Sequence, residues 1–263
     1  MKSILDFARA KRNHRPIAVV TAYDVLQARL LASSTVDALL VGDSAAMVVH
    51  GYPDTVHATL EMMVTHTAAV RRGAPEVLII TDLPFLSTRL GRDTATQAAG
   101  RLLQAGANAV KIEGAAGHGD LIPHLIQSGI PVMGHLGLTP QSVNQFGGHR
   151  VQGRSPAAAR RLRQESLLLE GLGVFALVLE CVPAALARSL TQELRVPTIG
   201  IGAGAGTDGQ VLVISDLLGM DPDFHPRFAR RYLDGARLVT KALNAFSRDV
   251  RAGRFPARKE VIA

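Results

Sequence analysis

The sequence lacks tryptophan and has a single cysteine, Cys181, among its 263 residues. One cysteine excludes an intrachain disulfide and suits a reducing compartment, so we expect a cytoplasmic protein. No uncharged apolar run approaches the roughly 18 residues that a membrane helix needs. The apolar stretch near the start of the chain is too short for a signal peptide and is interrupted by Asp6. The sequence therefore predicts no membrane partner.

Aromatic residues make up only 4% of the chain, although its formal net charge is +7. Such a charge suggests nucleic acids or acidic small molecules as partners, but non-specific nucleic-acid binders usually pair a basic surface with aromatic stacking platforms. Five of the seven excess charges lie in residues 221–263, where basic and apolar residues alternate, as in PRFARRYLDGARLVTKALNAF (226–246). This pattern predicts an amphipathic helix with a solvated basic face and no nucleic-acid partner.

Short apolar runs alternate with longer helical stretches through most of the chain, which is the pattern of repeated βα units. Their number and near-continuous apolar character predict an α/β protein with a (β/α)8 TIM barrel, additional C-terminal helices, and one domain over residues 1–263. The main alternative is a doubly wound open sheet, which the eighth run makes less favourable. The expected strands are residues 17–24, 37–44, 77–84, 109–114, 131–138, 174–181, 197–204 and 210–217.

Two connections are longer than usual for a barrel: residues 45–60 after the second expected strand and residues 139–154 after the fifth. Ser155 and Pro156 predict the start of the helix that follows the second of these, because serine caps helices and proline favours the first helical position. Long loops at the functional rim of a barrel often contact substrate. We expect that role for both.

Carboxylates end three successive expected strands: Asp43, Asp82 and Glu113. The C-terminal ends of barrel strands meet at the active-site rim, so we expect these three side chains to lie together. Their repulsion calls for a cation, and hard oxygen ligands suit Mg²⁺ better than Zn²⁺. A strand-end Asp can instead simply cap the next helix, but three on successive strands favour a metal site.

Further polar residues stand at the same expected edge. Lys111 lies two residues before Glu113 and therefore on the same side of its strand, where it could neutralise carboxylates or hold an anionic substrate. Glu180 ends the sixth strand and is a candidate general base. His135 closes the fifth strand, where it is either a structural histidine or a ligand for substrate oxygen. Cys181 points away from Glu180 and is read as a packing residue.

A glycine pattern, Gly204, Gly206 and Gly209, matches the dinucleotide fingerprint formally. The fingerprint must be followed by a helix, whereas the following QVLVIS looks like a strand. We therefore interpret the glycines as a turn that permits close backbone approach, and predict no dinucleotide site.

The motifs around these residues resemble the ketopantoate hydroxymethyltransferase family, and the resemblance spans nearly the whole chain. The shared motifs, in the family's order, are TAYD, LLVGDS, HTAAVRRGAP, DLPF, AGANAVKIEG, GHLGLTPQS, FGG, VQGR, LVLECVP, IGIGAG and TDGQ. The resemblance implies a phosphoenolpyruvate/pyruvate-type barrel that assembles into a homo-oligomer, often a decamer.

The resemblance also implies roles for particular residues. Asp43, Asp82 and Glu113 match the family's Mg²⁺ site, with one ion per subunit. Asp43, Ser44, Asp82 and Lys111 match its ketoacid contacts, Glu180 matches its proton acceptor, and His135 matches a further substrate-binding position. The implied reaction transfers a hydroxymethyl group from the co-substrate 5,10-methylenetetrahydrofolate to 3-methyl-2-oxobutanoate through a Mg²⁺-stabilised enolate, giving 2-dehydropantoate for pantothenate synthesis.

An alternative enzyme class is a Mg²⁺-dependent 2-oxo-acid lyase or phosphonomutase on a related barrel. Such enzymes typically carry a reactive cysteine in a mobile loop, whereas Cys181 falls at a strand end in this sequence. The position of this cysteine therefore favours the transferase.

Overall fold

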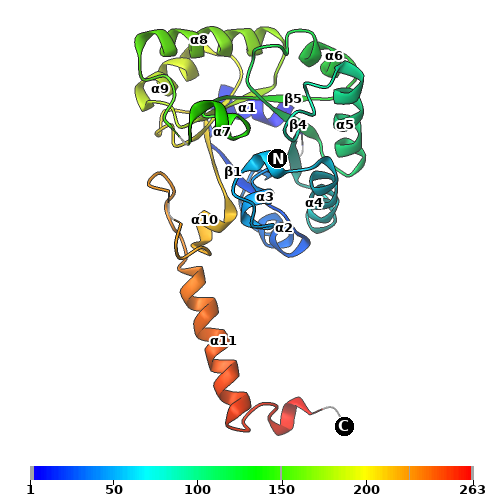
Figure 1. The fold of residues 1–263 in the computed structure, drawn as a ribbon, viewed down its shortest axis with the longest axis vertical. Helices are drawn as coiled ribbons and strands as arrows, with labels where there is room; N and C mark the ends of the chain where they lie inside the picture. Colours follow the sequence, from blue (N-terminus) through cyan, green and yellow to red (C-terminus); the bar gives the residue numbers. More distant parts are fainter. Residues whose placement is uncertain (1–2, 149, 225, 262–263) are drawn as a thin grey trace. The chain divides into compact units, whose positions relative to one another are not determined.

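Eight parallel strands close into a barrel in sequence order, which confirms the predicted fold (Figure 1). The last strand pairs with the first through Ile17 and Gly209, so the sheet has no free edge. The computed structural model describes residues 3–148, 150–224 and 226–261. The strands are β1 (Ile17–Thr21), β2 (Ala38–Val41), β3 (Leu78–Asp82), β4 (Ala109–Glu113), β5 (Val132–Gly137), β6 (Ala176–Glu180), β7 (Thr198–Ile201) and β8 (Gly209–Leu212).

Helices connect successive strands from β1 to β7 and surround the barrel, whereas a loop joins β7 to β8. Ser155 caps α8 by accepting a hydrogen bond from the backbone of Ala158, and Pro156 is the first helical residue, as predicted. The two long loops hold short helical turns. In residues 3–148 and 150–213 the helices are α1 (Leu5–Arg12), α2 (Val25–Ala32), α3 (Ala45–Val48), η1 (Thr55–His57), α4 (Leu60–Gly73), α5 (Arg92–Gln104), α6 (Leu121–Gln127), η2 (Pro140–Ser142), α7 (Val143–Phe146), α8 (Pro156–Gly171) and α9 (Ala184–Glu193).

The predicted strands are too long at their ends, and the last one contains an error. Residues 210–217 were expected to form one strand, but β8 ends at Leu212 and Ile214–Leu218 form helix α10. A strand here is limited by its neighbour, because β8 pairs with β1 over only four residues, from Ile17 to Val20. Beyond that pairing, the backbone hydrogen bonds are satisfied within a helix instead.

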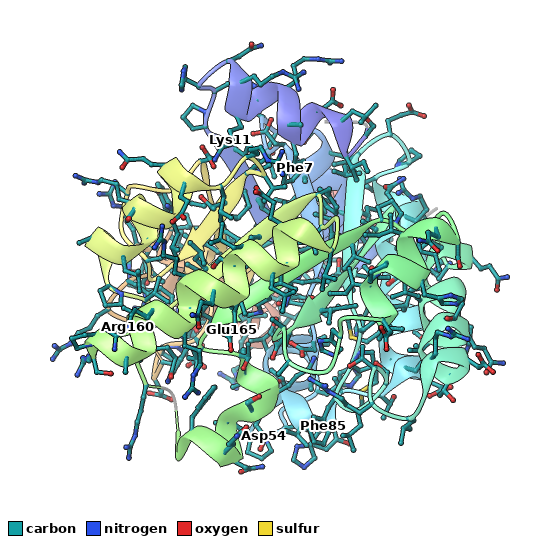
Figure 2. All side chains as sticks on the ribbon, turned by 90° about the horizontal axis from the view of Figure 1, so that it is seen from above. Phe7, Lys11, Asp54, Phe85, Arg160 and Glu165 are labelled. Atoms are coloured by element: carbon teal, nitrogen blue, oxygen red, sulfur yellow. The ribbon has the colours of Figure 1, made fainter. Side chains whose placement is uncertain are left out.

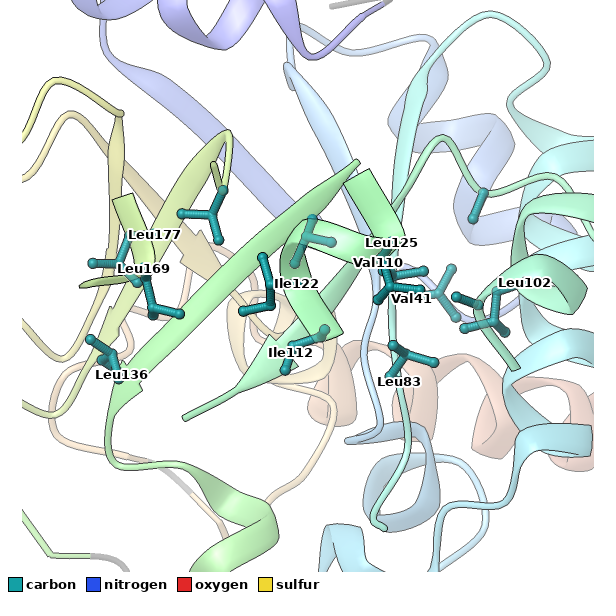
Figure 3. Packing of buried hydrophobic residues seen from close by; sticks show 14 of the residues in the cluster. Val41, Leu83, Leu102, Val110, Ile112, Ile122, Leu125, Leu136, Leu169 and Leu177 are labelled. Atoms are coloured by element: carbon teal, nitrogen blue, oxygen red, sulfur yellow. The ribbon is translucent and has the colours of Figure 1, made fainter. Parts of the chain in front are cut away.

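Alternation along each strand separates the apolar core into two layers. Leu39, Val110 and Leu177 point outward and belong to the layer between strands and helices, which Figure 3 shows in part. Their neighbours Leu40 and Ala109 point inward and fill the barrel. Because side chains alternate with a period of two, this pattern also decides which strand-end residues face the barrel axis.

Helix α1 closes the N-terminal end of the barrel. Phe7 is fully buried among the inward-facing strand residues and packs edge to face against Phe175, with ring centroids 5.5 Å apart. Lys11 fixes the helix by an ion pair with Asp208 at 2.8 Å. Figure 2 shows Phe7 and Lys11 at one end of the barrel, while Asp54 and Phe85, which lie in loops after β2 and β3, mark the other.

Residues Ile214–Ala263 form a second compact unit, distinct from Met1–Val213. It contains α10 (Ile214–Leu218), α11 (Gly235–Arg251) and η3 (Arg258–Glu260). The predicted amphipathic helix exists, but it begins at Gly235, so helical structure for residues 226–234 was wrong. Asp and Gly favour a helix start more than its interior, which explains the boundary. The assignment of residues 1–263 to one domain stays a prediction.

The apolar face of α11 is open to solvent within this unit. Leu243 and Phe246 expose 62% and 54% of their surface. Across the described part of the chain, no helix is long and apolar enough to cross a membrane.

Candidate active site

The inward positions at the C-terminal ends of β3 to β6 hold five of the predicted site residues. In the strand register, Asp82 is the partner of Lys111, and Glu113 is the partner of His135. Glu180 follows on β6 beside Gly137. Register and alternation together therefore assemble one polar cluster from residues that are up to 98 positions apart in the sequence.

Lys111 lies among the carboxylates. Its Nζ is 3.0 Å from Asp82 Oδ1 and 3.7 Å from Glu113 Oε1, and each of the three side chains is no more than 5% exposed. A lysine in the interior of a barrel is costly without such partners. Burial tends to lower the pKa of Lys111, but the negative charges of Asp82, Glu113 and Asp43 outweigh it and raise that pKa. Lys111 is therefore charged at neutral pH.

Asp43 follows β2 and brings a third carboxylate to the cluster. Burial, with repulsion from Asp82 and Glu113, raises the pKa of Asp43 well above its usual range. Burial also raises the pKa of Asp82, although Lys111 opposes the effect. For Glu113, burial acts in the same direction, but His135 and Lys111 outweigh it, so its pKa is lowered. Three ionised carboxylates would carry more negative charge than Lys111 can balance, and two of the three pKa values are raised accordingly.

His135 connects this cluster with Glu180. Its Nδ1 lies 3.3 Å from Glu113 Oε1, and its Nε2 lies 3.3 Å from Glu180 Oε2. Nδ1 is also 3.0 Å from Lys111 Nζ. Burial and Lys111 act to lower the pKa of His135, but Glu113 and Glu180 together raise it to about 9. At neutral pH the ring therefore carries a positive charge that balances one of the two carboxylates.

Gly137 allows the ends of β5 and β6 to approach each other. Its φ is +95°, and a Cβ atom there would lie 2.2 Å from the carbonyl oxygen of Glu180. Any side chain at this position would therefore push apart the strands that carry His135 and Glu180.

Ser44 lies beside Asp43, and its hydroxyl is engaged by a residue that sequence reasoning missed. Tyr23 Oη is 2.8 Å from Ser44 Oγ, and Tyr23 is 2% exposed. Burial raises the pKa of the Tyr23 hydroxyl, and the nearby charges of Asp82 and Asp43 add to the effect. A buried tyrosine at the end of the first strand, in the TAYD motif, was the available signal.

Gln141, in η2, is a second residue that was missed. Its side-chain amide donates to Asp43 Oδ2 at 2.8 Å and to the carbonyl oxygen of Leu83 at 2.9 Å. Its backbone N–H donates to Glu113 Oε2 at 3.0 Å. The signal for it was weak, because it is an uncharged residue in a long loop whose path the sequence does not define.

The helix-capping alternative does not describe these aspartates. Asp82 Oδ2 accepts a hydrogen bond from the backbone of Asp43, on the neighbouring strand, at 3.0 Å. Asp43 Oδ2 accepts a hydrogen bond from the side chain of Gln141, and helix α3 has no side-chain cap. The dinucleotide alternative is also excluded, because Gly209 begins β8 and not a helix.

Cys181 follows β6 directly and is half-buried. Its φ is +48°, an uncommon conformation for a residue with a Cβ atom. Burial and the charge of Glu180 raise the pKa of the Cys181 thiol to about 11. The thiol is thus almost entirely protonated at neutral pH, which makes it a poor nucleophile.

The acid cluster fits a hard divalent cation without forming a complete cage. Among the described residues, no three His, Cys, Asp or Glu side chains are spaced to surround one ion. Asp82 Oδ1 and Glu113 Oε1 are buried and make no hydrogen bond within that part of the chain. Mg²⁺ commonly binds one or two carboxylates and completes its shell with water and substrate oxygen. Asp82 Oδ1 and Glu113 Oε1 lie in ion-pair contact with Lys111 and His135 but keep lone pairs that suit that mode of binding.

Comparison with known proteins identifies the family. The sequence profile of ketopantoate hydroxymethyltransferase matches residues 1–258. The chain is 48% identical over 259 residues to the 3-methyl-2-oxobutanoate hydroxymethyltransferase of Francisella tularensis subsp. novicida, covering 98% of both chains. It is 50% identical over 260 residues to the enzyme of that name from Bdellovibrio bacteriovorus, covering 99% of both.

Solved structures agree on the fold. A 2,3-dimethylmalate lyase of the PEP mutase/isocitrate lyase superfamily superposes with a TM-score of 0.62 at 18% identity, covering 100% of this chain and 92% of the other. Phosphonopyruvate hydrolase with oxalate and Mg²⁺ gives a TM-score of 0.64 at 11% identity, with the same coverage. At such identities the likeness concerns the barrel alone. The full-length sequence match decides the assignment, and this chain belongs to the ketopantoate hydroxymethyltransferase family.

Proposed function

We propose that this protein transfers a hydroxymethyl group from 5,10-methylenetetrahydrofolate to 3-methyl-2-oxobutanoate, releasing 2-dehydropantoate and tetrahydrofolate in pantothenate biosynthesis. The named relatives support this activity over the whole length of the chain. The observation that carries the proposal is the cluster at the ends of β2 to β6, in which three carboxylates, Lys111 and the His135–Glu180 pair lie together.

The proposed metal ligands are Asp43, Asp82 and Glu113, with one Mg²⁺ per subunit. Counting His135 and Glu180 as a neutral pair, three carboxylates and Lys111 leave two negative charges, which one divalent cation balances. Mg²⁺ at this position would supply Lewis acidity that stabilises negative charge on the keto oxygen of the substrate.

The protein's own residues would hold the ketoacid and move its proton. Lys111 offers an ammonium group to the substrate carboxylate or oxyanion, and Ser44, already oriented by Tyr23, offers a hydroxyl beside Asp43. Asp43 and Asp82 would also contact the ketoacid. Glu180, 16% exposed, is placed to take the C3 proton of the substrate, and His135 would bind a substrate oxygen while holding Glu180. The resulting carbanion would attack the methylene carbon of the folate and break one of its two C–N bonds, and water would then displace the other. The water hydroxyl remains on the methylene group, and the substrate proton and the water proton reach the two nitrogens of tetrahydrofolate.

A lyase or phosphonomutase would have the same barrel fold, but such an enzyme typically needs a reactive cysteine, and Cys181 does not have that character. Cys181 is half-buried, and its raised pKa of about 11 keeps it as a thiol. The solved structures with such activities resemble this chain at no more than 18% identity among those compared above. If the alternative were correct, Cys181→Ala would abolish turnover; for the transferase, turnover is expected to stay near that of the wild type.

Proton exchange tests the proposal. We would incubate 3-methyl-2-oxobutanoate with the protein and Mg²⁺ in D₂O and follow the C3 proton by NMR. Exchange is expected for the wild type, and a loss of roughly 10²- to 10⁴-fold for Glu180→Gln, because a general base typically contributes that factor. Glu165→Gln, on helix α8, is the matched control. Absence of exchange by the wild type, and of product after the folate is added, would refute the assignment.

We also propose that the chain forms a homo-oligomer in the cytoplasm, a decamer being the expected state. The exposed apolar face of α11, including Leu243 and Phe246, is a surface that association would cover. Light scattering after gel filtration tests this, because ten chains of 27.9 kDa give about 279 kDa. A monomer at micromolar concentration would contradict it.

A further inference from the structure

Gln141 contacts the ends of three different strands. It is the central residue of η2, at the start of the long loop between β5 and α8. Its Nε2 donates to Asp43, which follows β2, and to the carbonyl oxygen of Leu83, which follows β3. Its backbone N–H donates to Glu113 at the end of β4. One residue of the loop thus engages two of the three carboxylates proposed to hold the metal.

These contacts stabilise charge in the cluster. Both Nε2 hydrogens and the backbone hydrogen of Gln141 are directed at oxygen atoms, and two of the acceptors belong to carboxylates. Hydrogen bonds to a carboxylate favour its charged form, and Gln141 donates one to Asp43 and one to Glu113. Gln141 therefore opposes the repulsion between the acids without adding a charge that would compete with a cation.

The same loop is tied to the Glu180 side of the pocket. The backbone N–H of Leu138 donates to the carbonyl oxygen of Glu180 at 2.8 Å, and that of Gln152 donates to the carbonyl oxygen of Cys181 at 2.9 Å. Gln141 is the point at which this loop reaches the acids. By contrast, Gln145, four residues further on in α7, is exposed.

We propose that Gln141 is a positioning residue that fixes Asp43 and Glu113 in the orientation that receives the cation, and that docks the β5–α8 loop onto the acid cluster. The inference rests on the proposed function for its metal, but its effect on the loop can be measured without metal. Groups that orient metal ligands typically change metal affinity by 10- to 100-fold when they are removed.

The test compares Gln141→Ala and Gln141→Glu with Gln145→Ala as the matched control. In the first measurement, hydrogen exchange of the metal-free full-length protein is followed by mass spectrometry. Exchange in residues 139–146 is expected to become about tenfold faster in both Gln141 variants, because alanine loses the side-chain bonds and glutamate repels Asp43. The control is expected to match the wild type. Circular dichroism verifies that each variant is folded.

In the second measurement, Mn²⁺ is titrated calorimetrically in place of Mg²⁺, without substrate. Gln141→Ala is expected to weaken Mn²⁺ binding about tenfold or more, and Gln145→Ala to leave it unchanged. Wild-type exchange in the folded Gln141 variants, or unchanged Mn²⁺ affinity in Gln141→Ala, would overturn the proposal. If the wild type itself binds no Mn²⁺, the proposed metal site is wrong, and the metal-free exchange data alone decide whether Gln141 docks the loop.

Discussion

Replacement of Lys111 tests the electrostatic description of the cluster most directly. Lys111→Met keeps the length and most of the volume of the side chain but removes its charge. At an effective dielectric constant of about 20, unit charges at the observed 3.0 and 3.7 Å attract by about 5.5 and 4.5 kcal/mol. Loss of the lysine's own desolvation cost offsets part of this. Since removal of one partner from a buried ion pair typically costs about 3–5 kcal/mol, we expect a loss of that size.

Urea denaturation with EDTA, and again with Mg²⁺, measures the effect. If the proposed metal site is correct, Mg²⁺ is expected to raise the free energy of unfolding more in Lys111→Met than in the wild type, because a cation bound there would replace the missing positive charge in the folded state. Lys241→Met, on the exposed side of α11, should change stability by no more than about 0.5 kcal/mol. A loss below about 1 kcal/mol for Lys111→Met, or an equal response to Mg²⁺ in both proteins, would refute the reasoning.

The difference in the free energy of unfolding between wild type and Lys111→Met should depend on pH in a direction that the pKa shifts define. The folded-state pKa of Lys111 is raised, so its stabilising contribution is complete below the unfolded value of 10.5 and is lost only above it. The pKa values of Asp43 and Asp82 are raised as well, and both acids can take up protons on acidification. The difference in the free energy of unfolding between wild type and Lys111→Met is therefore expected to narrow on acidification, as these acids take up protons.

Three further predictions use single substitutions or reagents. Alkylation of Cys181 by iodoacetamide at pH 8 should be about 100-fold slower than that of a thiol with the reference pKa of 9.0, because its pKa is raised to about 11. Gly137→Ala should cost roughly 2–4 kcal/mol in urea denaturation, because the position combines a positive φ with a Cβ 2.2 Å from a backbone oxygen. Gly100→Ala, where a Cβ meets nothing within 4 Å, should cost nothing. Asp43→Asn should stabilise the metal-free protein, since its charged form is disfavoured by burial and Asp82, and should abolish stabilisation by Mg²⁺.

Each of these has a contradicting outcome. Alkylation with an inflection near pH 9 would mean that burial and Glu180 do not raise the pKa of the Cys181 thiol. Equal stability of Gly137→Ala and Gly100→Ala would show that β5 and β6 do not need their close approach. An undiminished response of Asp43→Asn to Mg²⁺ would show that Asp43 is not a ligand of the proposed metal site.

Strand-end polarity was the most informative signal in the sequence. Asp82, Lys111, Glu113, His135 and Glu180 each end or nearly end an apolar run, and alternation predicts the side to which each points. The structure places all five inward. The inward placement of these five residues could be predicted from the local sequence pattern, because in a barrel the C-terminal ends of all strands meet at one rim.

Residues that act from loops or through long-range contacts were not predicted. Gln141 reaches Asp43 across 98 positions of sequence, and no periodicity marks such a contact. Tyr23 looked like an ordinary strand-end aromatic residue, and its bond to Ser44 depends on the path of the chain after β2. The end of β8 depended on how many residues of β1 it could pair with, which is a property of the partner strand.

Helix α1 closes the N-terminal end of the barrel, and this closure affects the order in which the substrates can bind. With Phe7 buried among the inward-facing residues, the N-terminal end of the barrel is closed, so the substrates of the proposed reaction would approach from the side of the loops after the strands. The small ketoacid would have to reach Lys111 and the acids at the C-terminal ends of the strands, and the larger folate would approach from the same side. A folate that bound first would obstruct the path of the ketoacid. We therefore expect compulsory-order kinetics in which the ketoacid binds first and the last substrate to enter yields the first product to leave.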